Sequence, residues 1–146
     1  MKVRKMDHVG VNVQDLPAAT AFFVDLGFEV LGEQSGMEGA WLDTIVGLKG
    51  VRTSIVMLGA PQGGSNLELV KFHSPEDDDG IRQQPANVLG IRHLAFVVED
   101  IDAIVAKLKS RGVELFSEVQ TYEDCYKLLY IRGPEGIILE LAEELL

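Results

Sequence analysis

The stretch MDHVGVNVQDLPAATAFFVDLGFEV, residues 6–30, is the most informative part of the sequence, because the chain repeats its pattern 85 positions later. The second copy is IRHLAFVVEDIDAIVAKLKSRGVEL, residues 91–115, and the two copies align without a gap. Identical residues at aligned positions include His8 with His93, Asp15 with Asp100, Gly27 with Gly112 and Glu29 with Glu114. A repeat of this length predicts two copies of one structural unit.

Each copy has the pattern of a strand, a helix and a second strand. In the first, Val9, Val11 and Val13 alternate with polar or small residues, which indicates a strand with one apolar face. Asp15 is a typical helix N-cap, and apolar residues then recur at helical spacing until Gly27. Residues 28–34 become extended again. The second copy predicts a strand at 91–98, a helix at 101–111 and a strand from Val113.

Two further strands are expected after each copy. They fall at 51–59 and 65–72 in the first half and at 125–133 and 136–145 in the second. Each half therefore reads β-α-β-β-β, and the chain is predicted to be α+β. Residues 40–48, AWLDTIVGL, are expected to form a short helix or a loop flap.

The predicted organisation is a first module at 1–74, a linker at 75–87 and a second module at 88–146, within one compact domain. The linker is expected because its residues are polar, contain proline and include three consecutive aspartates, Asp77 to Asp79.

Composition excludes several function classes. The chain has 146 residues, 47% of them hydrophobic, and a net charge of −10. Because nucleic-acid and anionic-membrane surfaces attract clustered Lys and Arg, neither partner is expected. A small-molecule or protein partner remains, and a small-molecule substrate is expected. Apolar runs are too short to span a bilayer and the N-terminal residues do not resemble a signal peptide, so a cytoplasmic location is expected. The single cysteine, Cys125, excludes an internal disulfide and a thiolate metal cluster.

Four polar residues recur in register. His8 and His93 begin the first strand of each copy, while Glu68 and Glu140 lie between two leucines in the last strand of each half. Strand alternation places all four side chains on the face away from the helices. Their neighbours on that face are small or apolar, so bare charges there would be costly unless paired or bound to a cation. Imidazole and carboxylate ligands suit Zn, Ni, Co, Mn or Fe, which predicts a metal site.

These stretches resemble the vicinal oxygen chelate superfamily, which includes glyoxalases, bleomycin resistance proteins and extradiol dioxygenases. Residues 6–30 look like its module opening, and GPEGIILELAE, residues 133–143, looks like its ending. Gly133 departs from the Asp that many members carry before the proline. The resemblance implies an eight-stranded, partly open mixed β-barrel around one cavity, with a divalent metal ion that chelates two substrate oxygens. It implies that His8, Glu68, His93 and Glu140 are the metal ligands.

The resemblance also implies a reaction class. Four protein ligands favour a glyoxalase-type lyase or isomerase that stabilises an enediolate-like intermediate of a small carbonyl or 2-hydroxy acid derivative. Glu140 is the favoured general base and Glu68 the second choice, since a carboxylate that leaves the metal can accept a proton. The alternatives are a small-molecule sequestering protein of the resistance type, a methylmalonyl-CoA epimerase-like enzyme and an extradiol dioxygenase. A homodimer is expected, and the resemblance leaves open whether the modules pair within one chain or across the dimer.

Overall fold

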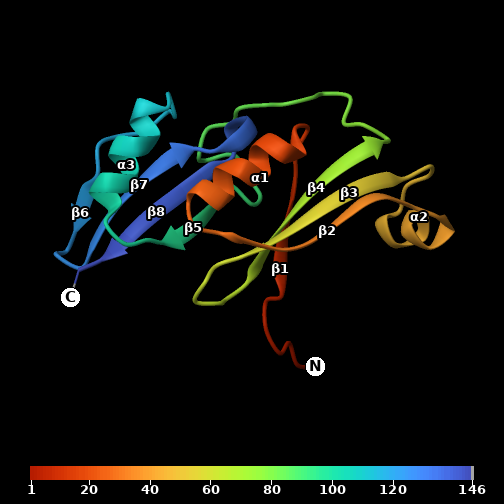
Figure 1. The fold of residues 1–146 in the computed structure, drawn as a ribbon, viewed down its shortest axis with the longest axis horizontal. Coiled ribbons are helices and arrows are strands. Elements are labelled where there is room, and N and C mark those ends of the chain that lie inside the picture. Colours follow the sequence, from red (N-terminus) through yellow and green to blue (C-terminus); the bar gives the residue numbers. More distant parts are fainter. Residues whose placement is uncertain (146) are drawn as a thin grey trace. The chain divides into compact units, whose positions relative to one another are not determined.

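The computed structural model of the chain describes residues 1–145, and within them lie eight strands and three α-helices (Figure 1). The elements of the first half are β1 His8–Asn12, α1 Leu16–Asp25, β2 Glu29–Glu38, α2 Ala40–Val46, β3 Arg52–Gly59 and β4 Asn66–Ser74. The elements of the second half are β5 His93–Val97, α3 Ile101–Ser110, β6 Gln120–Tyr122, β7 Tyr126–Arg132 and β8 Ile138–Glu144, with a 3-10 turn at Pro134–Gly136.

The two halves have the same sheet topology. The chain divides into two compact units, one from Met1 to Gly80 and the other from Ile81 onward. The strand order is β1-β4-β3-β2 in the first and β5-β8-β7-β6 in the second. In each sheet the first strand pairs in parallel with the last, and the other pairs are antiparallel. The predicted α+β class and the repeated β-α-β-β-β module are therefore confirmed.

In the first unit, α1 covers one face of the sheet. The Asp15 carboxylate accepts a hydrogen bond of 3.0 Å from the backbone N–H of Ala18, which caps the helix as predicted. Phe23 on α1 and Leu69 on β4 are both fully buried. Because successive strand residues point to opposite faces, the burial of Leu67 and Leu69 turns Glu68 to the other face of the sheet.

The second unit repeats this core with different side chains. Ile101 of α3 is fully buried, as are Leu139 and Leu141 of β8. The Asp100 carboxylate caps α3 by accepting from the N–H of Ala103, although Asp100 itself has a left-handed backbone, with φ of 55°. Leu139 and Leu141 take the places of Leu67 and Leu69, so Glu140 also points away from the helix.

In three segments the structure differs from the predicted elements or specifies them further. AWLDTIV forms the short helix α2 in the connection between β2 and β3, and Figure 1 shows it next to these two strands. The strand expected from Val113 is absent there: Leu115 makes only an isolated bridge to Ile131, and the edge strand β6 begins at Gln120. Residues 75–92 contain no helix or strand.

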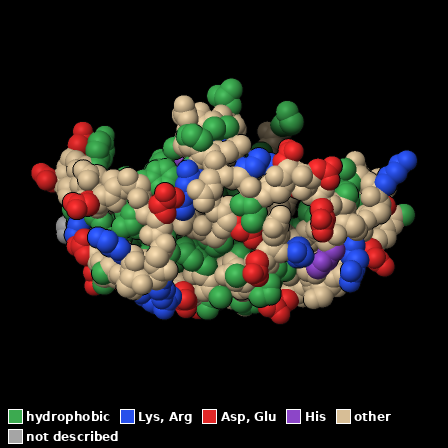
Figure 2. Space-filling model, turned by 90° about the horizontal axis from the view of Figure 1, so that it is seen from above, with side chains coloured by type: hydrophobic (Ala, Val, Ile, Leu, Met, Phe, Trp, Pro, Cys, Tyr) green, Lys and Arg blue, Asp and Glu red, His purple; other side chains and the backbone are tan. Residues whose placement is uncertain are grey.

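Charge is distributed over the surface. On the face in Figure 2, Asp and Glu side chains are interspersed with Lys and Arg side chains. None of the helices within residues 1–145 is long and apolar enough to cross a membrane.

Candidate metal centre

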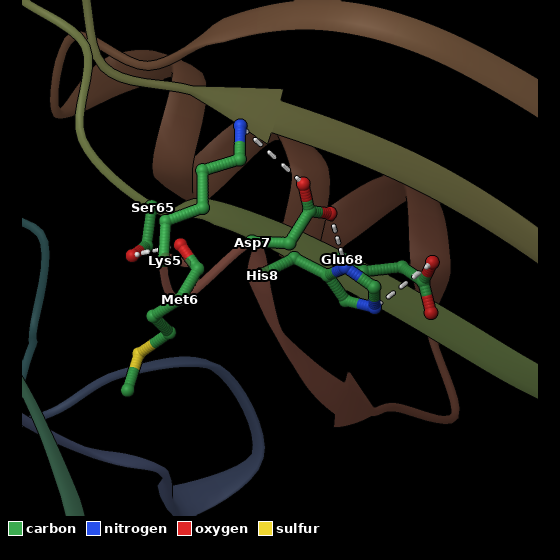
Figure 3. A network of polar contacts seen from close by, with 6 residues as sticks. All are labelled: Lys5, Met6, Asp7, His8, Ser65 and Glu68. Carbon is green, nitrogen blue, oxygen red and sulfur yellow. Dashed lines mark hydrogen bonds and ion pairs between the residues drawn. The ribbon is translucent and has the colours of Figure 1, made fainter. Parts of the chain in front are cut away.

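The first unit brings one predicted histidine and one predicted glutamate together. His8 is the first residue of β1, and Glu68 lies on β4, the strand that pairs with it in parallel. His8 Nε2 lies 3.7 Å from Glu68 Oε2 (Figure 3). Gly10 is the residue opposite Glu68, and a Cβ there would lie 3.9 Å from the carboxylate. Apart from the adjoining backbone, no other atom of residues 1–145 lies within 4 Å of that position, so the space next to the Glu68 carboxylate at Gly10 is not filled by a side chain.

Asp7 fixes the other side of the His8 ring. His8 Nδ1 lies 2.8 Å from Asp7 Oδ2, as Figure 3 shows. Since a carboxylate can only accept, Nδ1 carries the proton and donates it. In the neutral imidazole, Nε2 is then left with its lone pair directed toward Glu68. Histidines that ligate metals are commonly oriented by a carboxylate in this way.

The same hydrogen bond alters both pKa values. Donation to Asp7 is the largest cause that raises the pKa of His8; partial burial opposes it, and the Glu68 charge adds to the rise. The hydrogen bond from His8 likewise lowers the pKa of Asp7. Both shifts have the sign expected for a carboxylate that stabilises an imidazolium.

The second unit forms the equivalent pair. His93 begins β5, and Glu140 lies on β8, its parallel partner. His93 Nε2 lies 3.4 Å from Glu140 Oε1. The exposure of the side chains matches that of the first pair: 39% for each histidine, 22% for Glu68 and 20% for Glu140. The repeat thus extends to the geometry of the polar pair.

The surroundings of the two histidines differ. A shift of 85 residues places Arg92 at the position of Asp7, and Arg92 donates to Gln84 instead. The His93 ring packs on Tyr130, with ring centroids 4.8 Å apart and the phenol oxygen 3.4 Å from Nε2. One histidine is therefore held by a carboxylate and the other by an aromatic ring. Sequence comparison of the copies missed Asp7 because this residue does not recur.

The chemistry and spacing of each pair fit a divalent ion. Zinc lies about 2.0–2.2 Å from imidazole nitrogen and carboxylate oxygen, so two ligands at a tetrahedral angle are about 3.4 Å apart. The His8–Glu68 and His93–Glu140 separations, 3.7 Å and 3.4 Å, are close to that value. Within residues 1–145, no three His, Cys, Asp or Glu side chains gather as a metal cluster, and each polar pair lies within its own unit.

Aromatic and aliphatic side chains continue the face that carries Glu140. Tyr130 is the residue opposite Glu140 in the β7–β8 ladder, and Leu128 is opposite Ala142. The neighbouring residue, Leu129, is 3% exposed on the helix side. Alternate residues of β7 point to opposite faces of the sheet. Leu128 and Tyr130 therefore lie on the same face as the His93–Glu140 pair.

Comparison with known proteins identifies the family. The sequence model of the Glyoxalase/Bleomycin resistance protein/Dioxygenase superfamily matches residues 5–141. The uncharacterized protein YaeR of Escherichia coli K12 is 28% identical over 145 residues, which cover 97% of this chain and 98% of YaeR. The crystal structure of a glyoxalase family protein from Bacillus cereus is 41% identical, with a TM-score of 0.93 over 99% of this chain and 97% of that one.

A more distant structure shares the fold. The trypanothione-dependent glyoxalase I of Leishmania major is 22% identical, with a TM-score of 0.68 over 97% of this chain and 88% of that chain. The superfamily match spans nearly the whole sequence, and it agrees with the resemblance of residues 6–30 and 133–143. The chain belongs to the glyoxalase/bleomycin resistance protein/dioxygenase superfamily.

Proposed function

We propose that His8, Glu68, His93 and Glu140 bind one divalent metal ion. We propose further that the protein is a glyoxalase-type lyase or isomerase acting on a small carbonyl compound or 2-hydroxy acid derivative. The metal is one of Zn, Ni, Co, Mn or Fe, which imidazole and carboxylate ligands accommodate. A homodimer and a cytoplasmic location complete the proposal.

One observation carries this function: each module holds a histidine and a glutamate at the same positions of the same two strands. The separations are similar, and all four side chains are partly open to solvent. A His–Glu pair that only stabilised its own sheet would not need to occur in both modules. Two such pairs would supply four donors, and an ion that accepts five or six ligands would keep positions for substrate oxygens.

The expected chemistry is a proton transfer next to a carbonyl group. A bound divalent ion would act as a Lewis acid toward charge that develops on a substrate oxygen. Glu140 removes the proton from the hydroxyl-bearing carbon beside the carbonyl and returns it to the former carbonyl carbon, while the hydroxyl proton passes to the former carbonyl oxygen, which completes an isomerisation. Glu68 is the second candidate for this base. His8 and His93 keep the site in place and take no part in proton transfer.

Deuterium exchange at the substrate carbon tests the base. The full chain, loaded with Ni²⁺ or Zn²⁺, is incubated in D2O with lactate or with the hemithioacetal of methylglyoxal and 2-mercaptoethanol, and exchange is followed by NMR. Glu140→Gln is expected to slow exchange by about 10²-fold or more, the usual contribution of a general base. Glu144→Gln is the matched control, because Glu144 lies on the same strand and is exposed.

Four outcomes would change the proposal. Unaltered exchange in Glu140→Gln removes that residue as the base, and a larger loss in Glu68→Gln transfers the role to Glu68. Oxygen consumption with a diol points to a dioxygenase. Tight binding of these compounds without exchange in the wild type indicates a sequestering protein.

A further inference from the structure

The second unit contains a hollow beside its polar pair. Its volume is about 380 Å³, within the range of ligand pockets of about 300–1,000 Å³. The side chains that line it are mainly aromatic or aliphatic, and they include Phe116, Gln120, Tyr122, Leu128 and Tyr130. An aromatic ring with a short polar substituent is small enough to enter such a space.

The hollow lies on the face of the sheet that carries Glu140. Tyr130 is directly opposite Glu140 in the ladder of β7 and β8, and Leu128 is opposite Gln120 in that of β6 and β7. Paired residues point to the same side of a sheet. Tyr130 connects the hollow with the polar pair, because its ring lines the hollow and also packs on His93.

Ring contacts fix the walls of the hollow. The Phe116 and Tyr130 centroids are 5.9 Å apart, with their planes at 66°, an edge-to-face arrangement. The Arg132 guanidinium lies 4.8 Å from the centre of the Phe116 ring. Arg132 is itself held by the carbonyl oxygen of Gly136 and by Glu114. Because the Arg132 guanidinium already has these partners, it is a weak binding site for an anionic ligand. The Phe116 and Tyr130 rings, in contrast, can both contact an aromatic ligand.

We propose that this hollow binds the aromatic substituent of the substrate. Resting on the proposed metal site, this identifies the substrate class as a 2-hydroxy acid or 1,2-dicarbonyl compound with an aryl group. The two adjacent oxygens occupy the metal site while the ring packs against the exposed sides of Phe116 and Tyr130, which are in edge-to-face contact with each other. Aromatic pairs in this geometry attract beyond their buried area, which favours an aryl group over a methyl group. Phe116, Leu128 and Tyr130 thus determine specificity.

Mandelate and lactate provide a matched pair of probes, because both carry the same hydroxyl and carboxylate and differ in a phenyl or methyl group. Their affinities for the Ni²⁺-loaded full chain are measured by calorimetry. Mandelate is expected to bind about tenfold more tightly, in keeping with one well-packed ring. NMR is expected to show changes at the Phe116 and Tyr130 ring resonances with mandelate and not with lactate.

Variants separate the ring contact from general effects. Phe116→Ala is expected to reduce the preference for mandelate to less than about threefold while lactate affinity stays unchanged, because only the phenyl group reaches the hollow. Tyr130→Phe retains the ring and is expected to retain the preference. Phe28→Leu is the control, since Phe28 packs on Phe23 in the first unit. Equal affinity of the wild type for mandelate and lactate overturns the proposal, as does a preference that survives Phe116→Ala.

The same measurements distinguish this proposal from the metal site. If the protein binds Ni²⁺ and does not prefer mandelate, the hollow is not an aryl site and the metal proposal stands. If Ni²⁺ does not bind and mandelate still perturbs the Phe116 and Tyr130 resonances, the hollow binds aryl groups and the metal proposal fails.

Discussion

At the scale of single residues, the two histidines of the repeat are held differently. His8 donates from Nδ1 to the Asp7 carboxylate, whereas His93 packs on Tyr130. A carboxylate on one ring nitrogen fixes the tautomer and makes the other nitrogen a better metal ligand. In His8, the bond to Asp7 therefore fixes the tautomer with an unprotonated Nε2 before any metal binds.

Replacing Asp7 with Ala is expected to lower the pKa of His8. The hydrogen bond to Asp7 stabilises the protonated ring, so the wild-type pKa is raised, and its loss lets the ring deprotonate at lower pH. An NMR titration of the metal-free protein at low ionic strength measures this directly. Divalent metal affinity is expected to fall by about tenfold, as with other residues that orient a ligand.

Lys5→Ala is the control for this variant. Lys5 lies 3.8 Å from the Asp7 carboxylate on the exposed side, so its removal leaves the hydrogen bond to His8 in place. An unchanged titration of His8 in Asp7→Ala would show that the carboxylate does not govern the ring.

At the scale of elements, the turn between β7 and β8 explains the departure at Gly133. A Cβ on this residue would lie 2.7 Å from Leu139 Cδ1 and 3.4 Å from the carbonyl oxygen of Ile137. Leu139 is fully buried, so its side chain has little room to move. The Asp that many family members carry here does not fit this turn, and the difference leaves Glu140 on β8 unchanged.

Gly133→Asp is therefore expected to destabilise the protein by about 1–3 kcal/mol, the usual cost of overpacking a core. Urea denaturation measures the change. Gly32→Ala is the matched control, because nothing lies within 4 Å of the added Cβ in β2, and its effect is expected to be within about 0.5 kcal/mol. Equal stability of Gly133→Asp and wild type would mean that Leu139 can move aside.

Most elements followed from the sequence because the repeat gave two independent readings of one pattern. The Asp15 and Asp100 caps and the leucines that flank each glutamate fixed the helices and the strand faces. The edge strand could not be placed in the same way: residues 113–119 pair only through a bridge at Leu115, and β6 lies further along the chain. The alternation of apolar and polar residues does not predict at which residue the backbone stops pairing with the neighbouring strand.

The candidate site was predictable only where it recurs. His8, Glu68, His93 and Glu140 follow from the repeat and from strand parity. Asp7 could not be found by comparing copies, because Arg92 stands at its equivalent. The signal for it would have been local: an acidic residue beside a histidine at the start of a strand. Phe116 was also missed, because it lies in the irregular segment before β6.

At the scale of the whole molecule, each compact unit carries half of the proposed metal site. Two ligands alone bind a divalent ion weakly, so neither module is expected to be functional by itself. Duplicating the module supplies both the second sheet and the second pair of donors. The proposal gives the same ratio of metal to protein whether the two pairs share an ion within one chain or across a dimer.

Calorimetric titration of the metal-free full chain with Ni²⁺ or Zn²⁺ tests this directly. One ion per chain is expected, and loss of a donor from either half, as in His8→Ala or Glu140→Gln, is expected to weaken that single binding event. Glu144→Gln is expected to bind as the wild type does. Two independent ions per chain, or no binding at all, would contradict a metal centre built from both halves of the repeat.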